Sequence, residues 1–131
     1  PPYGRITAID MNTGEHLWMQ PNGQGPRNHP AIAELDLPWL GQRGRAAPLL
    51  TKTLLFLGEG TEAALSILPI AGGKFFRAWN KETGDVLWEI ELAAGTSGAP
   101  MTYMANGRQF IVVAIGDEET PSQLVALALA R

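Results

Sequence analysis

The sequence contains no cysteine among its 131 residues. Disulfide frameworks, thiolate metal sites and cysteine nucleophiles are therefore excluded from this chain. An excess of positive charge is also missing, since 10 Lys and Arg residues stand against 13 Asp and Glu residues and the formal net charge is -3. Because nucleic-acid-binding domains usually carry a basic patch, and no run of Lys or Arg occurs here, the composition argues against a nucleic-acid partner.

Long apolar stretches are absent as well. No segment reaches the roughly 18 consecutive apolar residues that a membrane-spanning helix needs, and the first residues lack the basic-then-apolar pattern of a secretory signal. The chain begins at Pro1 rather than at methionine, so we expect it to be part of a longer polypeptide. The apolar fraction of 45% is that of a globular domain, while 15 glycines and 10 prolines indicate many turns between short elements.

Two pairs of segments repeat within the chain. Residues 4–18 (GRITAIDMNTGEHLW) align with residues 74–88 (KFFRAWNKETGDVLW), and residues 47–51 (APLLT) align with residues 99–103 (APMTY). The first pair shares identical residues at Ala8/Ala78, Thr13/Thr83, Gly14/Gly84, Leu17/Leu87 and Trp18/Trp88. Matched segments in the same order indicate an internal repeat, which has to be settled before any fold is assigned.

Each copy of the first segment has the pattern of a β-hairpin. Asp10 and Asn80 can bond backbone two residues ahead, and the glycines that follow supply a positive φ at the exit of the turn. Asn106-Gly107 is a third hairpin signal. The strands expected from these turns and from the apolar runs cover residues 6–9, 16–19, 47–50, 54–57, 75–79, 86–92, 99–103, 109–115 and 124–129.

The predicted strands fall into groups of two, four and three. Four-stranded antiparallel units that recur at about 40–50 residues are typical of β-propeller blades. We therefore predict an all-β partial β-propeller of about two to three blades, with residues 1–131 in a single propeller domain. Since closed propellers have ~4–8 blades and an open arc leaves sheet edges bare, the remaining blades should come from the same polypeptide or from a partner.

Two segments depart from the repeat. Residues 20–45 are rich in proline and glycine, so we expect a long loop insertion that leaves the blade and covers one end of the propeller. The sequence leaves open which end this is, and at the cofactor end such a loop would control substrate access. Residues 58–73 are a second irregular excursion, in which residues 63–67 have the composition for one or two helical turns before Pro69 ends them.

The hairpin motif Ala-x-Asp/Asn-x-x-Thr-Gly-x-x-Leu-Trp resembles the tryptophan-docking motif of quinoprotein alcohol and glucose dehydrogenases. Residues 98–103 (GAPMTY) with residues 106–113 (NGRQFIVV) resemble the near-C-terminal hairpin of that family, and residues 124–129 (LVALAL) resemble its closing strand. Residues 3–10 and 44–60 look like the last blades of the membrane-bound glucose dehydrogenase branch. The chain thus resembles the C-terminal part of a dehydrogenase that uses pyrroloquinoline quinone (PQQ).

The resemblance implies an eight-bladed ring in which Trp18 and Trp88 are buried at contacts with the next blade. It also implies PQQ as cofactor, Ca²⁺ in the parent enzyme, a sugar or alcohol as substrate and a quinone or cytochrome as electron acceptor. The expected location is the periplasm, with any inner-membrane anchor in an N-terminal region that this chain lacks. The general base and most metal ligands would belong to earlier blades, so the chain alone should be catalytically incomplete.

Within this chain, the expected cofactor-binding residues lie at the start of an inner strand, at Gly44, Arg45 and Ala46. The corresponding segment runs along the cofactor in the family, and a guanidinium suits a polycarboxylate quinone through paired hydrogen bonds. The alternative is a loop arginine in water. His29, in the long loop, is a candidate substrate-side residue or a solvated loop histidine. No catalytic residue and no metal ligand is assigned to the chain.

Other patterns favour structural roles. His16 and His29 are the only histidines, so a histidine-based zinc site is implausible. The run 117–119 (DEE) lacks the alternating ligand spacing of a calcium loop, which favours a solvated turn. Residues 58–63 match Gly-x-Gly-x-x-Ala after a strand, but the dinucleotide-binding fold requires a helix on a parallel sheet. The hairpin repeat argues against such a sheet.

A non-catalytic propeller scaffold is the alternative function, because scaffolds can use the same tryptophan-docking repeats. The hairpin of residues 98–113 separates the two hypotheses. It resembles the dehydrogenases, and a scaffold does not require it.

Overall fold

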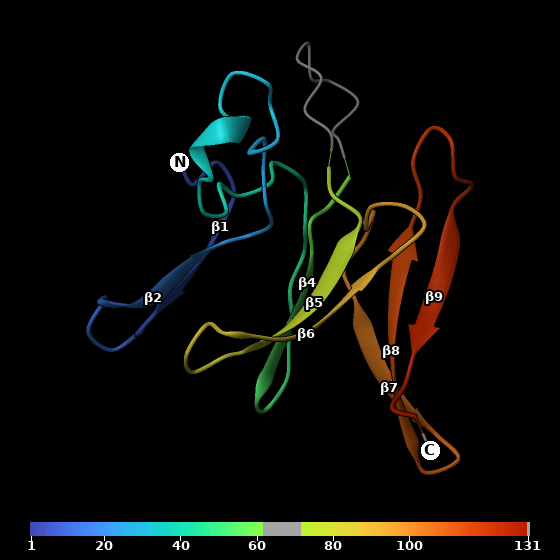
Figure 1. Cartoon of the computed structure of the whole chain (residues 1–131). Coiled ribbons are helices and arrows are strands. Elements are labelled where there is room, and N and C mark those ends of the chain that lie inside the picture. The colour runs from blue at the N-terminus through green and yellow to red at the C-terminus, as the bar shows by residue number, and fades with distance from the viewer. Residues whose placement is uncertain (62–71, 131) are drawn as a thin grey trace.

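The computed structural model describes residues 1–61 and 72–130, which form three antiparallel sheets (Figure 1). The first sheet pairs β1 (Arg5–Ile9) with β2 (His16–Pro21). The second has the order β3 (Leu49–Leu50), β4 (Leu54–Gly58), β5 (Phe75–Asn80) and β6 (Val86–Glu91), and the third has the order β7 (Met101–Ala105), β8 (Arg108–Ile115) and β9 (Gln123–Leu127). The predicted all-β arrangement of two, four and three strands is confirmed.

A single turn of 3-10 helix, η1 (Ala33–Leu35), lies between β2 and β3. Across the described residues, no helix has the length and apolar character that crossing a bilayer would require. The helical turns expected at residues 63–67 fall outside the described residues. β3 is shorter than the predicted strand of residues 47–50, since Pro48 has no N–H to donate to a sheet ladder.

The tight turns adopt the conformations that their residues favour. Gly14 and Gly84 both have a φ of 76°, and the carboxylate of Asp10 accepts a hydrogen bond from Asn12 N at 2.7 Å. At the third hairpin, Asn106 and Gly107 have φ values of 50° and 73°. Two consecutive positive φ values are the signature of the two-residue turn whose twist matches that of the flanking strands.

The connections divide between the two ends of the sheets. The turns β1–β2, β3–β4, β5–β6 and β7–β8 lie at one end, whereas the β2–β3, β6–β7 and β8–β9 connections lie at the other (Figure 1). β2 extends to Pro21, two residues beyond the predicted strand end at residue 19, so the long loop begins at residue 22. This loop lies at the end opposite the tight turns. The end of β4 and the start of β5 meet it there.

Two apolar clusters separate the three sheets. The first lies between the second and third sheets and consists of Phe76, Leu92, Ala94, Ile111, Val113 and Ile115. The second consists of Leu55, Leu57 and Trp79, against which Ile6, Trp18, Trp39 and Ala46 pack from the first sheet and the loop after it. Because alternate side chains of a strand point to opposite faces, β4 and β5 contribute to both clusters. Both faces of the second sheet are thus covered, as in stacked propeller blades.

Trp18 joins the first sheet to the second, as predicted. Its indole Nε1 donates a hydrogen bond to Lys81 O at 2.9 Å, and its ring lies against Gly84, where a Cβ would come within 2.7 Å of ring carbons. Trp88 differs, because it is 43% exposed. The prediction that Trp88 is largely buried is wrong for this chain, since the third sheet presents no equivalent Thr-Gly turn among the described residues.

Candidate functional site

The long loop has a hydrogen-bonded base. Residues 22–24 run beside residues 40–42, with Gln42 N donating to Asn22 O at 2.6 Å and Gly41 N donating to Gly23 O at 3.0 Å. Leu40 is buried in this base. The tip, residues 26–36, is mostly exposed and carries η1. The base is therefore part of the packed structure, and only the tip projects from it.

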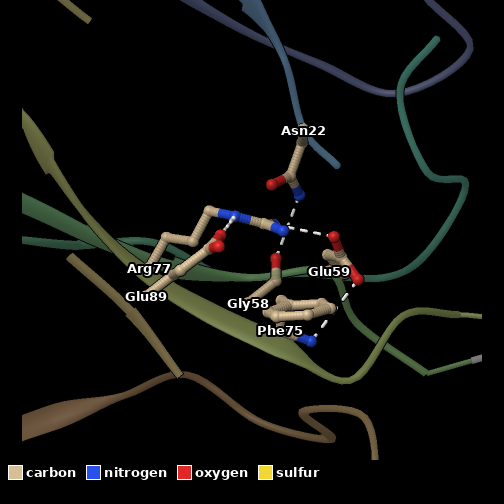
Figure 2. Close-up of polar contacts among 6 residues, drawn as sticks. All are labelled: Asn22, Gly58, Glu59, Phe75, Arg77 and Glu89. Carbon is tan, nitrogen blue, oxygen red and sulfur yellow. Dashed lines mark hydrogen bonds and ion pairs between the residues drawn. The ribbon is translucent and has the colours of Figure 1, made fainter. Parts of the chain in front are cut away.

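A buried ion pair lies beneath the base of the loop. Arg77, in the middle of β5, donates from Nη1 to Glu59 Oε1 at 2.7 Å and from Nε to Glu89 Oε2 at 2.9 Å (Figure 2). The side chains of Arg77 and Glu59 are 1% and 6% exposed, whereas that of Glu89 is 45% exposed. One guanidinium thus neutralises one buried carboxylate and reaches a second at the surface.

Aromatic rings complete the surroundings of Arg77. Its guanidinium carbon lies 4.8 Å from the ring centroid of Trp39, in the base of the long loop, and 5.0 Å from that of Phe75. Cations are attracted to the faces of aromatic rings, and more strongly where water is excluded. Arg77 therefore connects the second sheet to the long loop as well as to Glu59.

The carboxylate of Glu59 is enclosed by backbone. Oε2 accepts a hydrogen bond from Phe75 N at 3.4 Å. A Cβ on Gly73 would lie 1.6 Å from Oε2, and a Cβ on Gly23 would lie 2.3 Å from Oε1. Since real Cβ contacts are never so short, both glycines are required where they stand. Beside them, Asn22 Nδ2 donates to Gly58 O at 3.0 Å (Figure 2).

The residues predicted to bind the cofactor lie next to this pair. Arg45 N donates to Thr61 O at 3.4 Å, and a Cβ on Gly44 would lie 2.2 Å from Glu59 O. Ala46 packs against the apolar cluster of Leu55, Leu57 and Trp79. The three residues are thus held along the end of β4, at the end of the sheets that carries the long loop.

The side chains at this end fit a polycarboxylate ligand such as PQQ. Arg45 is exposed, and within residues 1–61 and 72–130 its guanidinium forms no ion pair. Thr96 Oγ1 and Asn22 Oδ1 are buried there without a hydrogen-bond partner among the described residues, and a Cβ on Gly58 would lie 2.3 Å from Thr96 Oγ1. An exposed guanidinium that forms no ion pair with the described residues is suited to binding a carboxylate.

A family model described as "PQQ: Glucose/ethanol/alcohol dehydrogenase, beta-propeller domain" matches residues 1–111. The chain belongs to this family. The resemblance of its repeats to those of quinoprotein dehydrogenases is therefore confirmed. As in that family, its strands form propeller blades, and the three sheets are a partial propeller.

Relatives within this quinoprotein family match most of the chain. It is 36% identical over 137 residues to the glycerol dehydrogenase large subunit of Gluconobacter thailandicus, covering 98% of this chain and 17% of that protein. It is 32% identical over 120 residues to the quinoprotein glucose dehydrogenase of Gluconobacter oxydans (strain 621H), covering 88% and 14% respectively. For the quinate/shikimate dehydrogenase (quinone) of Acinetobacter baylyi the identity is 31%, with the same coverage. The chain thus spans 14% to 17% of the length of these relatives.

Other side chains singled out in the sequence lie apart from the Arg45 region or have local roles. His29 is exposed in the tip of the loop, where its Nδ1 accepts from Ala31 N at 3.2 Å, and His16 is exposed on β2. β4 is antiparallel to both of its neighbours, which excludes the parallel sheet of a dinucleotide-binding fold. Among the described residues, no group of three or more His, Asp or Glu side chains is placed to hold a metal ion.

The acidic run of residues 117–119 begins a turn in this quinoprotein segment. Asp117 accepts hydrogen bonds at Oδ1 from Thr120 N at 2.7 Å and from Glu119 N at 3.0 Å. The hydrogen bond from the Thr120 backbone is the main reason that the pKa of Asp117 is lowered, since it favours the charged carboxylate. The run is therefore a self-bonded turn.

The lowered pKa of Asp117 predicts a specific acid dependence. Because the folded pKa lies below the unfolded one, the turn contributes stability above the unfolded pKa and loses it as the pH falls through the folded pKa. A pH titration of the carboxyl carbon by NMR should give a midpoint below the usual range for aspartate. Asp117→Asn should remove this dependence, and a midpoint in the ordinary range would contradict the turn geometry.

Sequence reasoning missed the ion pair of Arg77 with Glu59. One signal was available, because Arg77 stands among the apolar residues Phe75, Phe76, Ala78 and Trp79 of β5. A charged residue on the buried face of a strand requires a partner. The identity of that partner depends on pairing across β4 and β5, which the sequence alone does not provide.

Proposed function

We propose that the chain is the C-terminal segment of a PQQ-dependent dehydrogenase that oxidises sugars or alcohols. Membership of the quinoprotein family supports this, and the relatives that match the chain are named as dehydrogenases. The observation that carries the proposal is the exposed guanidinium of Arg45 beside Gly44, at the end of the sheets that bears the long loop. These features favour an enzyme segment over a propeller scaffold.

In this proposal each residue of the segment has a separate role. When bound, PQQ would supply the two-electron oxidant for the carbon that bears the substrate hydroxyl. Gly44 lets the backbone of the segment lie close to Glu59 O, where a Cβ would come within 2.2 Å. Arg45 pairs with a carboxylate of the cofactor through its fork of donors, and Ala46 anchors the segment on the apolar cluster.

The remaining components belong to the parent chain. Other blades of that chain would supply the general base and the Ca²⁺ ligands, and they would cover the exposed Leu17 and Tyr103 of the first and third sheets. The electron acceptor would be a quinone or a cytochrome, as the names of two relatives indicate for those proteins. We also propose that the parent protein is periplasmic.

The test measures PQQ binding and dye-linked oxidation of glucose, glycerol and quinate by the parent protein with Ca²⁺. Arg45→Ala should weaken PQQ binding by about 10- to 100-fold, the value of a hydrogen bond to a charged group. Lys52→Ala, which removes a cation at the opposite end, should leave binding unchanged. The chain of residues 1–131 alone should show no turnover with added PQQ and Ca²⁺. Turnover by that chain, or an Arg45→Ala variant that binds PQQ like the unmodified protein, would contradict the assignment.

A further inference from the structure

We propose that Arg77 and Glu59 are positioning residues that hold Gly44, Arg45 and Ala46 in place for the cofactor. The pair of Arg77 and Glu59, drawn with its surroundings in Figure 2, is called the clasp. The inference rests on the proposed function in naming the cofactor as the ligand. The positioning itself is a property of this chain and is testable without any ligand.

Three contacts link the segment that leads from the long loop into the inner strand to residues 58–61 or to Arg77. Trp39 lies over the guanidinium of Arg77, 4.8 Å away. Gln42 N donates to the backbone of Asn22, whose side chain in turn donates to Gly58 O. Arg45 N donates to Thr61 O. Each attachment leads to residues 58–61 or to the arginine that pairs with them, so residues 58–61 form the support of the segment.

Glu59 lies at the centre of this support. Its backbone oxygen faces Gly44, where a Cβ would come within 2.2 Å, so any displacement of Glu59 moves Gly44 and the adjoining Arg45. Its carboxylate is bonded to Arg77 and to Phe75 N, and it is enclosed by two glycines. The clasp therefore fixes the position of Glu59, and Glu59 fixes the position of the cofactor-binding segment.

Stability alone does not account for such a pair. A buried ion pair is often no more stabilising than apolar residues of the same size, because both charges lose their hydration. The guanidinium of Arg77 instead fixes the relative orientation of the groups around it, since it bonds to two carboxylates and stacks on Trp39 at the same time. The clasp gives β4 and the loop one relative position, which an apolar pair would not impose.

The test compares Arg77→Met, Glu59→Gln, Arg77→Lys and the double variant Glu59→Gln/Arg77→Met. Glu82→Gln is the matched control, because it makes the same chemical change in an exposed pair at the opposite end. The first readout is trypsin cleavage of the 131-residue chain after Arg43 and Arg45, relative to cleavage after Arg27 in the loop tip. The second is the dissociation constant for PQQ in the parent protein.

Loss of the clasp should raise the relative cleavage rate after Arg43 and Arg45 about tenfold or more, as local opening of the segment becomes easier. PQQ binding should weaken about tenfold or more, because Arg45 loses its aligned hydrogen bonds. Arg77→Lys should lie in between, since it keeps the charge and loses the fork. Glu82→Gln should change neither quantity.

The double variant separates positioning from stability. It should regain much of the melting temperature lost by Arg77→Met, because no unpaired buried charge remains, while cleavage stays fast and PQQ binding stays weak. Recovery of all three together would overturn the proposal, as would unchanged cleavage in a folded Arg77→Lys or double variant. If the unmodified parent binds no PQQ, the proposed function fails, and the cleavage readout still decides whether the clasp positions the segment.

Discussion

Replacing Arg77 with methionine is expected to lower the free energy of unfolding by about 3–5 kcal/mol, the cost of leaving a buried charge without its partner. The carboxylate of Glu59 is 6% exposed, and within the described residues Arg77 is its ion-pair partner. Methionine keeps most of the length of the side chain, so the loss comes mainly from charge and hydrogen bonding. Urea denaturation monitored by tryptophan fluorescence measures the change.

An exposed pair provides the comparison. Lys81 and Glu82 lie 3.7 Å apart, with side chains 33% and 77% exposed, so Lys81→Met should change the free energy of unfolding by only about 0–1 kcal/mol. Glu59→Gln/Arg77→Met should be more stable than Arg77→Met. A cost for Arg77→Met no greater than that of Lys81→Met would show that water reaches Glu59 and that the pair is not buried in solution.

Local signals were sufficient to predict most of the strands. Turns formed by Asx and glycine residues depend only on side chains and dihedral angles within a few positions. The turns at Gly14, Gly84 and Asn106 could therefore be predicted directly from the sequence. The strands between those turns then had little freedom in length. β3 is the exception. It contains only two residues, directly after Pro48, and the local sequence signals for its bounds are the weakest.

Long-range features were predicted less well. The repeat treats Trp18 and Trp88 as equivalent, yet their burial differs because it depends on the turn that the neighbouring sheet presents to each indole. The lack of room for a Cβ at Gly23 and Gly73 comes from the side chain of Glu59, which neither neighbours in the sequence. Gly44, Arg45 and Ala46 were predicted as cofactor-binding residues from family resemblance. The ion pair of Arg77 and Glu59 beside them was missed, since no short motif encodes it.

The second large effect on stability is expected at Gly84, whose turn has the same backbone conformation as the turn at Gly14. Gly84→Ala is expected to lower the free energy of unfolding by about 2–5 kcal/mol, which combines two costs. Part of this is the cost of a Cβ at a φ of 76°, roughly 1–2 kcal/mol. The rest is overpacking of about 1–3 kcal/mol, because the new Cβ would lie 2.7 Å from the Trp18 ring and displace the indole that bonds to Lys81 O.

Gly14→Ala is the matched control for the overpacking cost of Gly84→Ala. Gly14 has the same φ of 76°, and a Cβ there would meet nothing within 4 Å, so only the conformational cost of about 1–2 kcal/mol should appear. Urea denaturation of both variants, repeated in a Trp18→Ala background, forms a double-mutant cycle. With the indole absent, the difference between the two alanine variants should vanish. If Gly84→Ala and Gly14→Ala cost the same in the presence of Trp18, the indole does not dock on the Gly84 turn, and the contact between the first two sheets is not the one described.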